Sequence, residues 1–172
     1  MTSVTITSSA FRLSAVSLDN SSGRPTNSER KHEQAVAIFD LIDSNSVAPV
    51  DHIGGPCRSL LRWWKGLMVS VTTERAGHVL CHYQSLTPFR HILKDYALVC
   101  NVYADAKAPP SLDKLEAIDM GRRAVHNEAA ALLLERLRSK LVMDQETARR
   151  LFTLISLLVT RDSFDRAAPF LR

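Results

Sequence analysis

The 172-residue sequence predicts an α+β fold, in which a small antiparallel sheet packs against about four helices. Apolar and polar residues alternate near the N-terminus and again in the centre, which is typical of half-buried strands. The C-terminal half instead places apolar residues at helical spacing behind helix-start signals. An apolar fraction of 45% and a charged fraction of 23% are ordinary for a globular protein and exclude wholesale disorder.

The first fifty residues predict a tail, a strand and a helix. Residues 1–10 are expected to form a loose N-terminal tail, and alternation over residues 11–18 predicts the N-terminal strand of the sheet. A loop rich in Ser, Asn, Gly and Pro follows. Ser28 then suits the N-cap of a helix that runs to about Asp43, because apolar residues recur at helical spacing.

Short strands joined by glycine-containing turns are predicted between residues 58 and 84, and this spacing favours an antiparallel meander. Leu67, Val69 and Val71 alternate with polar residues, and Gly77 precedes a strand over residues 78–84. Residues 58–65 alternate poorly, so their conformation stays open.

The C-terminal half is predicted to be all helical. Thr87 and Pro88 supply an N-cap and a first-turn proline for one helix. Ser111 caps a long helix that runs to about residue 141, and Asp144 caps the last one.

Residues 11–159 are expected to form a single α+β domain, and residues 160–172 a C-terminal tail. No apolar stretch approaches the roughly 20 residues that a membrane span needs, so no membrane contact is expected. The three cysteines are dispersed and odd in number, which suggests reduced thiols in a cytoplasmic protein. The net charge of +4 is too small to indicate a nucleic-acid partner by itself.

The long helix carries polar residues on and beside its predicted apolar face. At about 100° per residue, Arg122 falls inside this face, and Asp119 lies close enough to pair with it. A buried ion pair of this kind would make Arg122 important for stability. His126 lies at the edge of the face. The candidate cluster consists of Asp119, Arg122, Arg123, His126 and Asn127.

Two interpretations of this cluster remain open. It is either a structural ion-pair network, or a site in which Arg122 or Arg123 binds an anion and His126 transfers a proton. Glu128 fits the second poorly, because it lies roughly 160° around the helix from His126. No nucleophile or cofactor motif accompanies the cluster, so no cofactor is expected. The favoured function is a non-enzymatic binding or regulatory protein, and the alternative is a small enzyme for an anionic metabolite.

A metal site is not predicted. On a strand, His78 and His82 lie about 13 Å apart at 3.3 Å per residue, and Cys81 points to the opposite face. Cys100 is expected in the core, on the apolar side of its helix.

A second candidate surface is basic. Arg90 and Lys94 lie one helical turn apart. Arg149 and Arg150 lie near the start of the last helix, where the dipole disfavours cations, so a carboxylate partner is expected. The surface is either a solvated face or a contact for RNA or an acidic protein. Aromatic residues are too sparse to support stacking on single strands. Candidate partners are therefore an acidic protein, RNA or an anionic small molecule.

Four blocks of the sequence resemble one protein family. They are EQAVAIFDLI at 33–42, SLTPFR with KDY at 85–96, EAIDMGRR with HNE at 116–128, and TARRLFTLI at 147–155. In this order they resemble uncharacterised protein family 0262, a set of small bacterial proteins, over roughly residues 11–159. The resemblance implies a bacterial cytoplasmic protein of that architecture and carries no assigned activity. The third block, which holds the whole candidate cluster, matches the family's most recognisable segment. The sequence departs from the family at Cys57, where an aromatic residue is usual, and over residues 58–65, where a more regular strand is expected.

Overall fold

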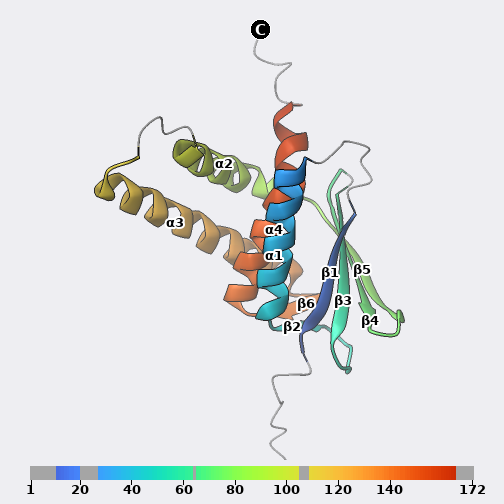
Figure 1. Cartoon of the computed structure of the whole chain (residues 1–172). Coiled ribbons are helices and arrows are strands. Elements are labelled where there is room, and N and C mark those ends of the chain that lie inside the picture. The colour runs from blue at the N-terminus through green and yellow to red at the C-terminus, as the bar shows by residue number, and fades with distance from the viewer. Residues whose placement is uncertain (1–10, 20–26, 64, 105–108, 166–172) are drawn as a thin grey trace, which may run out of the picture.

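The computed structural model describes residues 11–19, 27–63, 65–104 and 109–165, and it has the predicted α+β architecture (Figure 1). The expected N-terminal tail, residues 1–10, lies outside these residues. The elements in chain order are β1 Leu13–Asp19, α1 Ser28–Asp43, β2 Val47–Pro49, β3 Cys57–Trp63, β4 Leu67–Thr73, β5 His78–Gln84, a 3₁₀ turn Thr87–Phe89, α2 Arg90–Ala104, α3 Leu112–Leu137, β6 Leu141–Met143 and α4 Gln145–Asp165.

The main sheet has four strands in the order β1-β3-β4-β5. The β3-β4-β5 meander is antiparallel, as predicted, but β1 pairs with β3 in parallel. The expectation of a wholly antiparallel sheet is therefore wrong for the N-terminal strand. The cause is α1, which lies between β1 and β3 in the chain and provides the crossover that a parallel pair requires.

The segment left open by the sequence, residues 58–65, supplies most of β3. Its alternation is regular once Cys57 and Ser59 are counted with Leu61 on the buried face. The pattern is hard to read because Ser59 is polar and buried whereas Leu60 is apolar and exposed. Residue 64 lies outside the described residues.

A second sheet of two short antiparallel strands, β2 and β6, was not predicted. α3 ends at Leu137, earlier than expected, and β6 follows it, so the C-terminal half is helical except for this strand. A three-residue strand is too short to show periodicity. Pairing with β2 is a contact between distant parts of the chain, which local sequence does not reveal.

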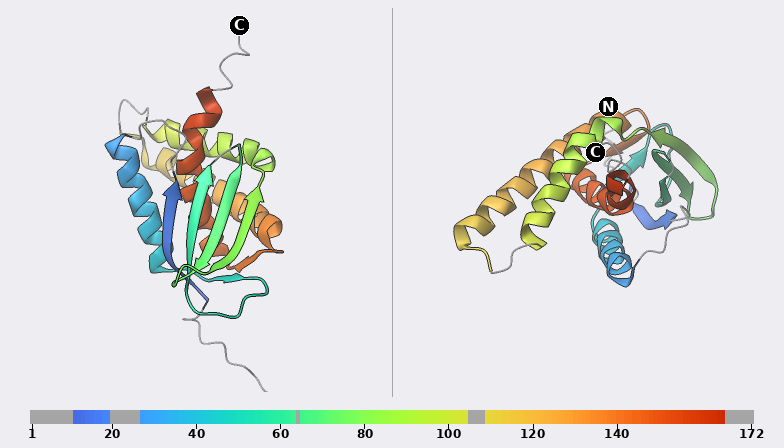
Figure 2. Two further views of the ribbon diagram at one scale, coloured as in Figure 1. Left: turned by 90° about the vertical axis from the view of Figure 1, so that its right-hand side faces the viewer. Right: turned by 90° about the horizontal axis from the view of Figure 1, so that it is seen from above.

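All four helices lie on one side of the main sheet, whose other face is open (Figures 1 and 2). α4 runs through the middle of this layer. Its buried side chains form the core together with inward-facing residues of the strands and of α1 and α3. In the described residues no helix combines the length and the apolar character that a membrane crossing requires.

The helix ends follow the predicted signals with small shifts. Asn27, rather than Ser28, caps α1 by accepting a hydrogen bond from the Arg30 amide at 2.9 Å. Ser111 and Asp144 cap α3 and α4, as expected. Thr87 is not an N-cap, because it begins the 3₁₀ turn that precedes α2.

At its C-terminal end α4 continues to Asp165, so the helix enters the segment that was expected to be a tail. Residues 166–172 lie outside the described part of the chain.

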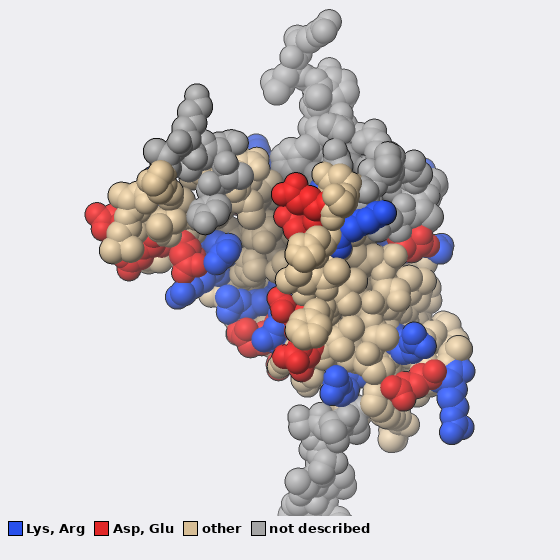
Figure 3. Space-filling model, viewed as in Figure 1, with Lys and Arg blue, Asp and Glu red and all other residues tan. Residues whose placement is uncertain are grey.

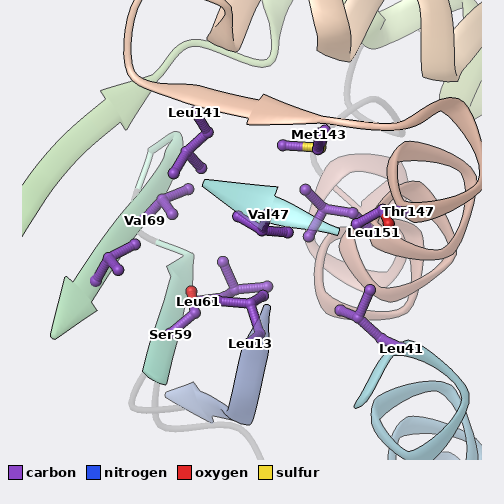
Figure 4. A pocket seen from close by; sticks show the side chains of 11 residues that line it. Leu13, Leu41, Val47, Ser59, Leu61, Val69, Leu141, Met143, Thr147 and Leu151 are labelled. Atoms are coloured by element: carbon purple, nitrogen blue, oxygen red, sulfur yellow. The ribbon is translucent and has the colours of Figure 1, made fainter. Parts of the chain in front are cut away.

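A small cavity of about 20 Å³ lies between the main sheet, the β2–β6 pair and the helices (Figure 4). Aliphatic side chains line most of it, with Ser59 and Thr147 as the polar exceptions. This volume holds about one water molecule and no metabolite.

Asn45 fastens the end of α1 to β1. Its Oδ1 accepts a hydrogen bond from the Leu13 amide at 2.7 Å. Its Nδ2 donates to the carbonyl oxygens of Leu13 at 3.1 Å and Leu41 at 2.9 Å. One amide side chain thus satisfies backbone groups of two elements that are distant in sequence.

We expect Asn45→Asp to lower the free energy of unfolding by about 1–3 kcal/mol, because a carboxylate cannot donate to the two carbonyl oxygens. Chemical denaturation measures the change. Asn101→Asp, at an exposed position of α2, is the control and should change stability much less. Equal effects of the two variants would show that the Asn45 hydrogen bonds contribute nothing specific.

Candidate functional site

α2 and α3 form an antiparallel hairpin that projects from the body of the protein (Figures 1 and 2). None of residues 94–102 and 112–128 is buried. Buried positions in α3 begin at Ala129, where the helix packs against α4. Residues 94–102 and 112–128 form the arm of the protein. The candidate cluster lies on this arm.

Asp119 connects the two arginines of the cluster. Its Oδ1 accepts a hydrogen bond from Arg122 at 2.9 Å, as the spacing predicts, and its Oδ2 pairs with Arg123 at 2.8 Å. The arginine side chains are 57% and 69% exposed, so the expectation that Arg122 is buried is wrong. Figure 3 shows charged side chains of both signs along α3 on this surface.

The helical wheel placed Arg122 on the correct face, but that face has no core to meet there. Leu133, eleven residues further along α3, is fully buried. Arg122 lies on the part of α3 that extends beyond the core, so the same face is exposed to water. A periodic pattern shows which side of a helix is apolar, and it does not show how far the neighbouring elements reach.

His126 occupies the base of the arm, half-buried, where α2, α3 and α4 meet. Its ring lies 5.1 Å from that of Tyr96 and 5.8 Å from that of Phe152, measured between centroids. Its Nε2 atom is buried and has no hydrogen-bond partner among the described residues. Burial lowers the pKa of His126, and the positive charges of Arg149 and then Arg122 lower it further. The imidazole is therefore mostly neutral at pH 7.

Tyr96 and Phe152 complete this ring cluster, with centroids 5.5 Å apart. Burial, with a smaller effect of the neighbouring Cys100, raises the pKa of Tyr96 to about 12. Sequence reasoning did not connect these residues with His126. Both carry an apolar-face signal in their own helices, and only the tertiary packing brings them to the histidine.

Cys100 lies exposed on α2, so the expectation that it belongs to the core is wrong. Like Arg122, it lies on the arm, where the apolar side of a helix extends beyond the core. Asn127, also on the arm, is exposed.

The predicted basic residues are dispersed among different partners. Arg149 pairs with Glu146 at 3.1 Å, which is the carboxylate partner that the dipole argument expects. Arg150 instead donates to the Ser44 carbonyl oxygen at 2.9 Å. Arg90 and Lys94 are exposed on α2.

His78 and His82 lie on β5, the strand that was predicted for them. In the described part of the chain, no three His, Cys, Asp or Glu side chains are grouped closely enough to hold a metal ion.

We expect Arg122→Ala to lower the free energy of unfolding by less than about 1 kcal/mol, because exposed ion pairs contribute little. Leu133→Ala, at a fully buried position of the same helix, should cost about 2–5 kcal/mol. Urea denaturation of both variants gives the comparison. A large loss at Arg122 would indicate that the side chain is buried after all.

The lowered pKa of His126 predicts a pH dependence of stability. Well above pH 6.5 the imidazole is neutral in both the folded and the unfolded chain, so the full stability is present. Below it, the unfolded chain binds the proton first, and stability falls as the pH approaches the lower folded-state pKa.

Thermal midpoints measured between pH 7.5 and about 5 test this, above the range in which most carboxylates titrate. His126→Phe keeps a ring in the cluster and removes the titration, so its midpoint should fall less than that of the wild type. Parallel curves for the two proteins would contradict the assignment.

This chain is similar to known proteins over most of its length. The model of an uncharacterised protein family, UPF0262, matches residues 10–161. A UPF0262 protein of Rhizobium etli is 49% identical over 152 residues, which are 88% of this chain and 96% of the relative. A UPF0262 protein of Agrobacterium fabrum is 47% identical over the same shares of the two chains. A third, of Brucella canis, is 48% identical over 86% of this chain and 92% of the relative.

These bacterial relatives carry only the designation of the family, which has no known function. No solved structure matches the chain. The match covers the sheet, the helices and the candidate cluster, and the chain belongs to the uncharacterised protein family UPF0262.

Proposed function

We propose that this protein is a non-enzymatic binding or regulatory protein, and that Arg122 and Arg123 on its arm hold an anionic group of a partner. The observation that carries the proposal is the shared carboxylate: two exposed guanidinium groups pair with the single side chain of Asp119. The cluster therefore keeps one positive charge in excess.

Asp119 orients both arginines but uses only a few of their hydrogen-bond donors. Each oxygen of its carboxylate meets one guanidinium group, and a guanidinium group has five N–H donors. Most donors of Arg122 and Arg123 are therefore left for another acceptor. Paired guanidinium groups suit carboxylates and phosphates, which accept two parallel hydrogen bonds.

The alternative, an enzyme in which His126 transfers a proton, has less support. A general acid or base must come within hydrogen-bond reach of its substrate. The Nε2 atom of His126 is buried, and its ring packs between Tyr96 and Phe152. We assign His126 a packing role, in which the neutral ring joins the arm to α4.

Among the candidate partners, an acidic protein segment fits best. Small metabolites are generally held in concave pockets that cover most of their surface, and the two arginines are instead more than half exposed. Single-stranded RNA would require aromatic platforms beside the basic groups. Tyr96 is the aromatic residue at the base of the arm, and its ring is engaged with His126 and Phe152.

The proposal includes a cytoplasmic location and a single domain over residues 11–159. Three free cysteines, two of them exposed, agree with a reducing compartment.

Titration with a fluorescent oligoglutamate peptide tests the proposal. The wild type should bind with an affinity that falls as salt rises, and Arg122→Glu/Arg123→Glu should abolish binding. The matched control, Arg136→Glu/Arg138→Glu, makes the same charge change at exposed positions near the end of α3. It should retain most of the affinity.

If both double variants lost the same affinity for the peptide, binding would depend only on the net charge of the protein, and the proposal would be wrong. Parallel titrations with oligouridylate and with citrate identify the other partner classes. Tighter binding of either would replace the acidic segment as the partner.

A further inference from the structure

The arm carries several exposed apolar side chains. Four large apolar side chains on it are about half exposed or more: Leu98, Val102, Leu112 and Met120. Leu112 is 79% exposed and Met120 is 65% exposed. Because none of the residues of the arm is fully buried, its two helices have less of the tertiary packing that normally stabilises helices of this length. An exposed apolar surface of this kind marks an interaction site.

The outer face of α3 shows how a partner helix would fit. Exposed residues recur there at alternating spacings of three and four, the pattern of a two-helix contact. Besides Met120 they are small or polar, so another helix can approach closely. The residues are Asp113, Ala117, Met120, Ala124, Asn127 and Ala131.

The charged residues beside this face are self-complementary. When a second copy of α3 runs antiparallel to the first, residues of opposite charge face each other. Glu116 and Arg123 are both exposed and lie two helical turns apart along the same side of Met120. Glu116 has no ion-pair partner among the described residues, and Arg123 uses only part of its donors on Asp119. In an antiparallel pair related by a twofold axis, Glu116 of each chain would meet Arg123 of the other. The same register places Met120 against the small side chain at position 117.

We infer that the outer face of α3 is the interface of a homodimer, in which the arms of two chains pack antiparallel around Met120. A C2 interface requires one surface that is complementary to itself, and the order acidic, apolar, basic along α3 meets that requirement. The interface shares Arg123 with the proposed anion site and does not use Arg122. Arg122 projects roughly 160° around the helix from Met120, so dimerisation leaves it accessible.

Sedimentation equilibrium of the full chain, in the micromolar range and at low salt, tests this inference. The wild type should show a mass near twice that of one chain. Glu116→Arg and Arg123→Glu should each raise the dimer dissociation constant roughly tenfold or more, because each places like charges opposite one another twice. The combined variant restores opposite charges and should regain dimerisation.

Two further variants test the contribution of Met120 and control for a charge change outside the interface. Met120→Lys should give a monomer with an unchanged far-ultraviolet circular dichroism spectrum. Glu135→Arg, at an exposed position of α3 outside the arm, is the matched control and should remain dimeric.

A monomeric wild type, or single charge variants as dimeric as the wild type, would overturn the inference. Failure of the combined variant to recover dimerisation would overturn the antiparallel register. A monomeric Met120→Lys protein that still binds the oligoglutamate peptide would separate this interface from the anion site.

Discussion

The structure depends on the burial of one helix, α4, between the main sheet and the other helices. The helix packs against α1 and α3, its residue Leu151 lines the small cavity together with inward-facing strand residues, and Leu154 and Phe152 are fully buried. Polar contacts fix α1 to the same helix, because Arg30 donates twice to the Leu157 carbonyl oxygen, at 2.7 and 3.0 Å. Where α4 supplies a surface, the chain has a core. Where α2 and α3 extend past it, they are exposed.

Local patterns predicted most elements of this fold. The meander, the strand at His78–Gln84 and the helices behind Ser111 and Asp144 follow from alternation, spacing and capping, which act within a few residues. The parallel pairing of β1 and the β2–β6 sheet did not follow. Both are contacts between segments separated by an entire helix or more, and no short-range signal encodes them. The strand β3 was hard to predict because Ser59, a polar residue, lies on its buried face and interrupts the apolar alternation.

In the candidate site, too, local contacts were predictable from the sequence and tertiary contacts were not. The contact between Asp119 and Arg122 is local, so spacing predicted it, whereas the exposure of Arg122 depends on how far α3 extends past α4. His126 was placed at the edge of the apolar face, but its ring partners come from α2 and α4. The residues that stabilise the fold therefore lie in the body, and the groups available for interaction lie on the arm. Separation of this kind suits a binding protein, because changes on the arm leave the core intact.

Hydrogen exchange measured by mass spectrometry at low and high protein concentration tests this separation most directly. The account predicts that amides of α4 around Phe152 and of α3 beyond Ala129 exchange slowly, at one rate, at both concentrations. Amides of residues 96–102 and 113–121 should exchange far faster in dilute protein and slow down as the concentration rises. Uniform protection along the whole of α3, independent of concentration, would contradict a stable body that carries an exposed, self-associating arm.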